Sequence, residues 1–174
     1  MRRVLPSLIG LLLAGGCHIF DGPGDVTLAP KPSSGCVGVG ITPGLHEGEI
    51  ESGGLTRSYL LVVPEGRTGE SLPLVFNLHG FTSSAQAQRS YSGMDVVAER
   101  EGFVLVYPNG VVGPEGTASP FAGEGSRRYW PAGSCCGPTE GTPDDVAFLR
   151  DLLRTLSGEL CLDMRRVYAT GMSN

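Results

Sequence analysis

The chain of 174 residues is long enough for one domain with a buried core, and 40% hydrophobic and 18% charged residues are typical of a globular protein. A net charge of −5, without any run of lysine or arginine, argues against a nucleic-acid partner. Glycine (27) and proline (13) make up nearly a quarter of the residues, which disfavours a helical bundle and predicts long irregular connections.

The N-terminal segment has the layout of an export signal. Two arginines precede the apolar run VLPSLIGLLLAGG, which is too short to cross a membrane as a helix. The small residues before Cys17 resemble a bacterial lipobox, in which the cysteine is lipidated. We therefore expect residues 1–16 to be a signal peptide of the lipoprotein type; an ordinary secretory signal cleaved nearby is the alternative. Both predict an extracellular or periplasmic protein, and a lipidated Cys17 would anchor it to the outer membrane.

Export gives the other four cysteines an oxidising environment, which favours disulfides. A bond between the adjacent Cys135 and Cys136 would close a small, strained ring. We therefore expect each of them to join a distant partner, one Cys36 and the other Cys161. A zinc site is disfavoured because adjacent cysteines lack the spacing of zinc ligands and no histidine lies near them. No metal or cofactor is expected.

The first part of the exported chain is predicted to be a tether followed by a pair of strands. Residues 17–35 are rich in Gly, Pro and Ser, and we expect them to connect the anchor to a domain spanning 36–174. The β-formers at 57–63, RSYLLVV, predict a strand that ends before Pro64. A weaker strand at 48–52, GEIES, precedes it across a Gly-Gly turn, so the two are expected to pair antiparallel.

Strands and helices then alternate. The apolar runs at 73–78 and 103–108 are typical of strands buried on both faces, and a helix is predicted between them at 92–101. A longer helix is predicted at 143–158, followed by a short strand at 165–171. This alternation predicts an α/β fold with a mostly parallel sheet and helices on both faces.

The helix at 143–158 has a start signal and an apolar face. Thr142 can cap it, and Pro143 suits its first position. The apolar face that we expect to be buried consists of Val146, Phe148, Leu149, Leu152, Leu153 and Leu156.

No helix or strand is predicted at 109–142, a segment that leaves the carboxyl end of a central strand. Open α/β sheets bind ligands at this edge, and connections longer than about fifteen residues are often functional. The segment contains Tyr129 and Trp130, the only tryptophan of the chain. We expect an ordered, crosslinked loop in which Tyr129 and Trp130 contact the substrate.

Ser173 directly follows the last predicted strand, in the sequence Gly171-Met172-Ser173. A nucleophile elbow has the pattern Gly-x-Ser-x-Gly between a strand and a helix, and the small residue before the serine permits a tight turn that exposes its hydroxyl. The sequence stops at Asn174, before the second glycine of that pattern. Ser173 is therefore the candidate nucleophile.

The stretch NLHGFTSS, which follows the buried strand at 73–78, resembles the oxyanion loop of α/β-hydrolases. Such a loop directs backbone amides at the oxyanion formed during acyl transfer. The candidate donors are the amides of Phe81, Thr82 and Asn174. We interpret His79 as a structural residue that holds the loop, because the catalytic acid and base of this fold follow the nucleophile in the chain.

Together these stretches resemble the esterase family of polyhydroxybutyrate depolymerases and feruloyl or acetylxylan esterases. The matching pieces span residues 53–174 in the family's order: GGLTRSYLLVVPEG, LPLVFNLHGFTSSA, GFVLVYPNG, YWPAGSCCG, DDVAFLRDLL and RRVYATGMSN. The resemblance implies a serine hydrolase with Ser173 as nucleophile, acting on hydroxybutyrate, feruloyl or acetyl esters of a polyester or plant polysaccharide. In the family the chain continues through a helix, strands, an Asp and a His. We therefore expect a truncated α/β-hydrolase, lacking its C-terminal half and nearly inactive alone.

Two alternatives remain open. One is a non-catalytic exported lipoprotein that binds carbohydrate or ester ligands through Tyr129 and Trp130. The other is an α/β-hydrolase fragment of a different activity, such as a peptidase or lipase. The sequence leaves the acyl group, the alcohol and the oligomeric state undetermined.

Overall fold

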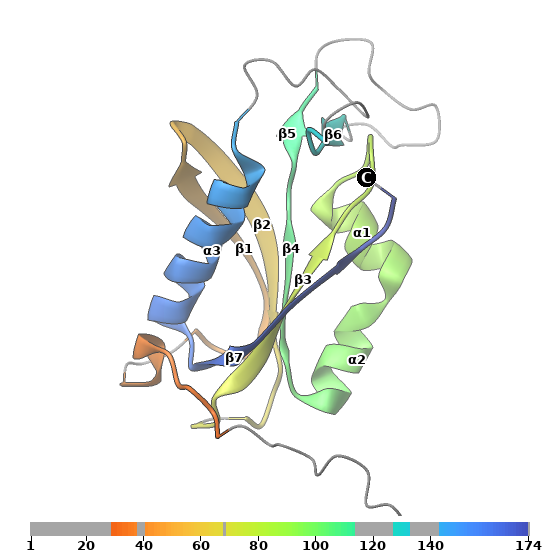
Figure 1. Ribbon diagram of the computed structural model, residues 1–174. Coiled ribbons are helices and arrows are strands. Elements are labelled where there is room, and N and C mark those ends of the chain that lie inside the picture. Colours follow the sequence, from red (N-terminus) through yellow and green to blue (C-terminus); the bar gives the residue numbers. More distant parts are fainter. Residues whose placement is uncertain (1–28, 38–40, 68, 114–126, 133–142, 174) are drawn as a thin grey trace, which may run out of the picture.

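The protein folds around one five-stranded sheet with helices on both faces (Figure 1). The structure is a computed structural model, and it describes residues 29–37, 41–67, 69–113, 127–132 and 143–173. The α/β arrangement expected from the sequence is confirmed.

The sheet has the strand order β1-β2-β4-β3-β7. Its strands are β1 (Gly44–Ser52), β2 (Leu55–Val63), β3 (Leu72–Leu78), β4 (Val104–Pro108) and β7 (Leu162–Gly171). The expected antiparallel pairing of β1 with β2 is confirmed, and β2 also pairs antiparallel with β4. Only β4–β3 and β3–β7 are parallel. The sheet is therefore mixed rather than mostly parallel, because β2 runs against both of its neighbours.

The helix predicted at 92–101 is confirmed as α2 (Met94–Glu101), and a further helix, α1 (Ala85–Ser92), directly precedes it. Gly93 separates them with a φ of 58°, a left-handed conformation that ends α1. The sequence did not predict α1 because its residues are mostly polar, and only Ala85 and Gln88 are buried. Within the described residues, no helix is long and apolar enough to cross a membrane.

The third helix, α3 (Asp145–Glu159), starts two residues later than predicted. Its cap is Asp144, whose carboxylate accepts a hydrogen bond from the Ala147 amide at 2.9 Å, so the prediction of Thr142 as the cap is wrong. Phe148 is buried as predicted, whereas Val146 is 57% exposed. Val146 lies in the first turn of the helix, where its side chain is exposed.

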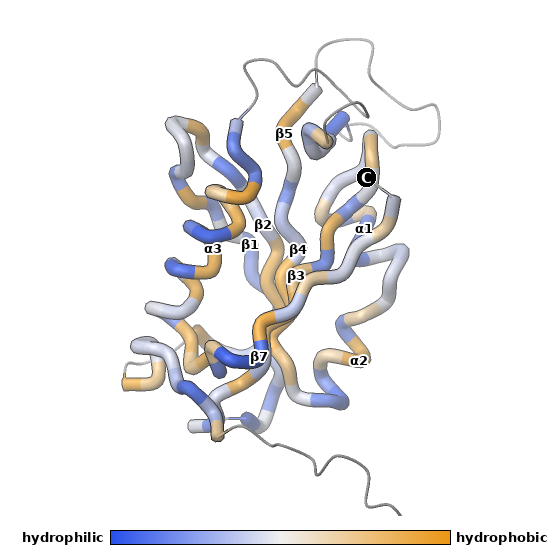
Figure 2. The backbone as a smooth tube through the Cα atoms, in the orientation of Figure 1, coloured by the Kyte–Doolittle hydropathy of each residue, from blue (hydrophilic) through white to orange (hydrophobic). Residues whose placement is uncertain are grey.

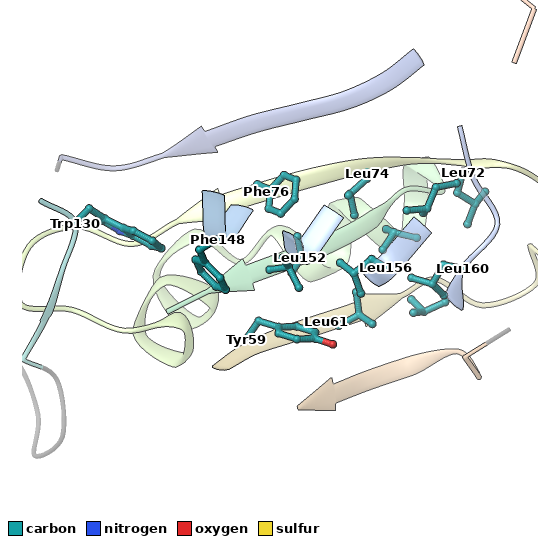
Figure 3. Packing of buried hydrophobic residues seen from close by; sticks show 14 residues of the cluster. Tyr59, Leu61, Leu72, Leu74, Phe76, Trp130, Phe148, Leu152, Leu156 and Leu160 are labelled. Carbon is teal, nitrogen blue, oxygen red and sulfur yellow. The ribbon is translucent and has the colours of Figure 1, made fainter. Parts of the chain in front are cut away.

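Each face of the sheet has its own core. On one face α3 packs on alternate residues of β2, β3 and β4 (Figure 3). The helix contributes Phe148, Leu152 and Leu156, and the strands contribute Tyr59, Leu61, Leu72, Leu74, Phe76, Val104 and Val106. On the other face α1 and α2 cover the intervening residues, including Leu60, Val62, Leu105 and Tyr107. Hydrophobic residues are accordingly concentrated on the central strands (Figure 2). Burial on both faces accounts for the continuous apolar runs in the sequence.

The segment at 109–142 is not wholly irregular. Two short strands, β5 (Val111–Val112) and β6 (Arg128–Tyr129), pair antiparallel beyond the carboxyl end of β4. Strands of two residues are too short to give a recognisable periodic pattern. Residues 114–126 and 133–142 lie outside the described part of the chain.

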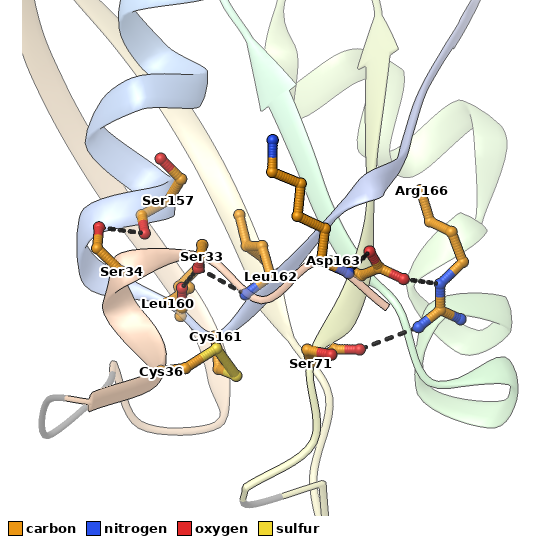
Figure 4. Close-up of a disulfide and its surroundings, with 11 residues drawn as sticks. Ser33, Ser34, Cys36, Ser71, Ser157, Leu160, Cys161, Leu162, Asp163 and Arg166 are labelled. Carbon is orange, nitrogen blue, oxygen red and sulfur yellow. Dashed lines mark hydrogen bonds and ion pairs between the residues drawn. A yellow bond between two sulfur atoms is a disulfide. The ribbon is translucent and has the colours of Figure 1, made fainter. Parts of the chain in front are cut away.

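The end of the predicted tether packs against the domain (Figure 4). The Ser33 amide donates to the Leu162 carbonyl at 2.8 Å, and the Met164 amide donates to the Lys31 carbonyl at 2.9 Å. A 3₁₀ turn, η1 (Ser34–Val37), follows. Residues 29–37, which we call the strap, thus pair with the base of β7, and the boundary expected at residue 36 is too late.

The predicted disulfide pairing is wrong. Cys36 of the strap bonds to Cys161, which directly precedes β7, so these two cysteines are partners of each other (Figure 4). The strap brings them together by pairing with the first residues of β7. Cys135 and Cys136 lie outside the described residues, as does Cys17.

Asp163 joins the strap to an irregular part of β7. Its side chain is buried and accepts hydrogen bonds from the amide of Lys31 at 2.8 Å, the amide of Arg165 at 3.1 Å and Nε of Arg166 at 2.6 Å. The pairing of β3 with β7 shifts register here. These bonds, the Lys31 amide first, lower the pKa of Asp163 to about 2.

Peptide mapping under non-reducing conditions should recover one crosslinked pair of peptides that contains Cys36 and Cys161. The bond joins the strap to the start of β7, so its reduction should lower the urea midpoint of unfolding. A reduced and alkylated sample provides the control. Recovery of Cys36 crosslinked to Cys135 or Cys136 would contradict the structure.

Replacement Asp163→Asn should destabilise the fold at neutral pH. A carboxylate with a lowered pKa stabilises the folded state above its unfolded pKa, 3.8, and this contribution disappears as the pH falls toward the folded value of about 2. The urea midpoints of wild type and variant should therefore differ at pH 7 and converge between about pH 4 and pH 2. Glu49→Gln, on the exposed side of β1, controls for the loss of one charge. A constant difference down to pH 2 would refute the assignment.

Candidate active site

Ser173 lies in a sharp turn at the carboxyl end of β7. Its φ is 61°, a left-handed conformation that is uncommon for residues other than glycine, and its side chain is exposed. A non-glycine residue in this region indicates a backbone that its surroundings hold in place. The turn has the form of a nucleophile elbow as far as the described chain extends.

The elbow is packed tightly against the end of β3. A Cβ added to Gly171 would lie 2.8 Å from the Leu78 carbonyl oxygen, so only glycine fits there. The Met172 amide donates to that same oxygen at 3.3 Å. A Cβ on Gly80 would lie 3.2 Å from Cβ of Ser173. The parallel pairing of β3 with β7 thus brings the predicted oxyanion loop directly beside the serine.

The loop after β3 presents two backbone amides. The Ser83 amide donates to the Gly80 carbonyl at 3.2 Å and closes a tight turn in which Thr82 has a φ of 59°. Within the described part of the chain, the amides of Phe81 and Thr82 at the tip make no hydrogen bond. Of the three predicted donors, Phe81 and Thr82 therefore lie in a loop that touches the elbow. Asn174 lies outside the described residues.

His79 is fully buried, and both of its ring nitrogens are engaged. Nδ1 donates to the Gly80 carbonyl at 2.8 Å, while Nε2 accepts from the Gly110 amide at 2.9 Å. Burial lowers the pKa of His79 to about 4, so the ring is neutral at physiological pH. The geometry agrees with the interpretation of His79 as a structural residue that ties the loop to the end of β4.

The two aromatic residues of β6 and its continuation have different positions. Trp130 donates from Nε1 to the His79 carbonyl at 2.9 Å, and its ring lies 5.1 Å from that of His79. Tyr129 is 5% exposed and meets Phe81 edge to face, at 6.4 Å between ring centroids. Tyr129 therefore packs against the loop residue Phe81 and is not among the described residues that line the hollow beside Ser173; its contact with the substrate stays a prediction.

An open hollow of about 510 Å³ adjoins Ser173. Its described lining is largely apolar and includes Leu78, Trp130, Ala132, Ala169 and Met172. Among the described lining residues there is no Asp, Glu, Lys or Arg. Such a surface accommodates an uncharged, apolar group next to the serine hydroxyl.

Two residues that organise this edge of the sheet escaped the sequence analysis. The Asn109 side chain accepts from the Ala85 amide at 2.8 Å and donates to the Ser58 hydroxyl at 3.0 Å, which joins α1 to β2 at the end of β4. Arg57 of β2 is buried and pairs with Asp145 at 2.7 Å. An Asn after a strand suggests only a turn, and a lone Arg in a strand suggests an exposed face.

Neither histidine in the described residues is placed to activate Ser173. The ring nitrogens of His79 are both engaged, and His46 lies on β1, at the opposite edge of the sheet from β7. His46 bonds through Nε2 to the Thr42 carbonyl at 2.7 Å. His18 lies outside the described chain. The described part of the chain also brings together no group of three possible metal ligands.

Comparisons with known proteins agree with this arrangement. Residues 57–174 match the family described as esterase PHB depolymerase. Feruloyl esterase B of Piromyces equi is 30% identical over 118 residues, which cover 67% of this chain and 19% of that protein. The putative esterase NocK of Nocardia uniformis subsp. tsuyamanensis is 34% identical over 136 residues, which cover 72% of this chain and 33% of that protein. The chain thus spans only a fifth to a third of the length of these relatives.

Solved structures add information on the fold. The crystal structure of native sOPH superposes with a TM-score of 0.51 at 17% identity, over 78% of this chain and 45% of that one. At this identity the similarity concerns the fold alone. Because the family match runs from β2 to the elbow and takes in more than half of the residues, this chain belongs to the PHB depolymerase family of esterases, with the fold of the α/β-hydrolases.

Proposed function

We propose that the protein is an exported serine esterase, which hydrolyses carboxylic esters through an acyl intermediate on Ser173. The observation that carries the proposal is the contact between two elements. Ser173, exposed in a left-handed turn, lies against Gly80 of the loop. The amides of the two residues that follow Gly80, Phe81 and Thr82, make no hydrogen bond within the described chain. A nucleophile beside oxyanion donors is the arrangement that acyl transfer requires.

In the proposed reaction, Oγ of Ser173 attacks the ester carbonyl carbon and gives its proton to a general base. The carbonyl oxygen becomes an oxyanion, which the amides of Phe81 and Thr82 stabilise, with Asn174 as a further proposed donor. The alcohol then leaves with a proton, and water releases the acid from the serine. The base and its orienting acid are proposed to follow Ser173 in the chain, because this is their order in the α/β-hydrolase fold.

We propose a neutral, apolar acyl group as the part of the substrate that enters the hollow. Trp130, Leu78 and Met172 offer it apolar surface, and no charged side chain of the described lining would pair with an ionised acid. Feruloyl, hydroxybutyrate and acetyl groups are all uncharged and satisfy this condition. A feruloyl esterase among the relatives supports the same class, with a plant polysaccharide or polyester as the polymer.

Export is also proposed. The disulfide between Cys36 and Cys161 suits an oxidising compartment, and a polymeric substrate would have to be met outside the cytoplasm. Lipidation of Cys17 remains a proposal based on the sequence of residues 1–17.

A fluorophosphonate probe should label Ser173 in a protein that also contains a general base after the nucleophile. Ser173→Ala should abolish labelling and lower ester hydrolysis by at least about 10³-fold, because no other group can carry the acyl intermediate. Ser90→Ala, at an exposed position of α1, is the matched control. The chain of 174 residues alone should label weakly, since neither described histidine can act as base. Labelling that persists in Ser173→Ala would rule out the proposed nucleophile, and binding of esters without hydrolysis would favour a non-catalytic role.

Stability should depend on pH through His79. The unfolded ring takes up a proton below about pH 6.5, whereas the folded ring resists protonation down to about pH 4. Stability should therefore fall by up to about 3 kcal/mol as the pH drops through this window. His79→Gln retains a donor and an acceptor without titrating, and should flatten the dependence in urea unfolding followed by Trp130 fluorescence. His46→Gln on β1 should keep the wild-type slope. Equal slopes in wild type and His79→Gln would contradict the assignment.

A further inference from the structure

Arg57 extends from β2 into the interior below the hollow. Its guanidinium is 4% exposed, and Nη2 donates to Asp145 at 2.7 Å and to the Asn109 carbonyl at 3.1 Å. The side chain therefore joins three elements: β2, the end of β4 and the first turn of α3. All three meet at the end of the sheet formed by the carboxyl ends of β3, β4 and β7, where Ser173 lies.

The guanidinium also lies between aromatic rings. Its central carbon is 4.0 Å from the centroid of the Phe148 ring and 5.9 Å from that of the Trp130 ring. Both distances permit a cation–π attraction. A planar guanidinium can stack on rings while its edge bonds to a carboxylate and a carbonyl, which an ammonium group cannot do. Arg57 thus contacts Trp130 as well as α3 and the end of β4.

The buried ion pair of Arg57 and Asp145 leaves some of its polar atoms without a hydrogen bond. In the described chain, Nε of Arg57 and Oδ2 of Asp145 are buried and make no hydrogen bond. Burial raises the pKa of the Asp145 carboxyl, and Arg57 opposes this shift. Desolvation of two ions costs free energy that incomplete pairing does not recover, so well-packed apolar residues of similar volume are often equally stable or more stable. A contribution to stability therefore does not account for the presence of Arg57 and Asp145 in the interior.

Trp130 connects the ion pair with the reacting groups. It lines the hollow beside Ser173, and it bonds through Nε1 to the backbone of His79, next to Gly80 of the loop. We propose that Arg57, held by Asp145, is a positioning residue that fixes Trp130 and thereby the wall against which the acyl group lies. The acyl-binding part of this inference rests on the proposed function.

Trp130 is the only tryptophan, so its fluorescence reports on this wall alone. The decisive variant is Arg57→Met/Asp145→Leu, which replaces the ion pair by apolar side chains. It should unfold at a urea midpoint equal to or above that of wild type. Acrylamide quenching of Trp130 should nevertheless rise at least about two-fold, because the ring, 7% exposed in the structure, loses its support. Arg100→Met/Glu101→Leu removes an exposed ion pair of α2 and should leave quenching unchanged.

Three results would overturn the inference. Quenching of the folded double variant could equal that of wild type, which would show that Arg57 does not position the ring. A double variant that fails to fold would show that the pair serves stability. Arg57→Lys provides a second test, because it keeps the charge and loses the planar fork: it should also raise quenching, and unchanged quenching would contradict the proposal. None of these measurements requires catalysis, so they stand apart from labelling of Ser173, which tests the esterase function itself.

Discussion

The parallel pairing of β3 with β7 is the constraint on which the candidate site depends. Its register sets Asn77 opposite Thr170 and Leu78 opposite Gly171, so both strands end at the same level. The loop after one strand and the elbow after the other then meet closely, and a Cβ on Gly80 would lie only 3.2 Å from Cβ of Ser173. A shift of register would separate the loop amides from Ser173. Backbone pairing, rather than any bond between side chains, therefore creates the reactive geometry.

The other end of β7 is fixed by the strap. The disulfide, two backbone hydrogen bonds and the carboxylate of Asp163 all act within the first residues of that strand. The disulfide spans 125 residues of sequence, and a loop of that length gives about 5 kcal/mol in the chain-entropy model. Beyond the strap, residues 168–173 are exposed, and β7 forms an edge of the described sheet. The strand that carries Ser173 is thus held at its base and by β3 alone along its length.

Polar side chains near the hollow connect the strands, helices and loop that surround it. His79 connects the loop to Gly110 and Trp130, Asn109 joins α1 to β2, and Arg57 connects Trp130 to α3. His79 and Arg57 are buried, Asn109 is half-buried, and the ion pair of Arg57 leaves polar atoms unpaired in the described residues. Apolar packing would hold the same elements with less directional precision. If the proposed esterase function holds, a site that has to position a carbonyl closely gains from such directional bonds.

The sequence by itself determined the strands of the five-stranded sheet, the α/β class, the long helix and the Gly-x-Ser elbow, because these depend on local patterns of apolar residues and glycine. Tertiary structure decided the remainder. The partner of Cys36, the docking of the strap and the burial of Arg57 depend on segments more than fifty residues apart, and no local pattern encodes such contacts. Helix α1 was missed because its mostly polar sequence is stabilised by a cap at Ser84 and by Asn109. The position of Tyr129 likewise follows from Phe81 lying against it, which only the folded chain brings about.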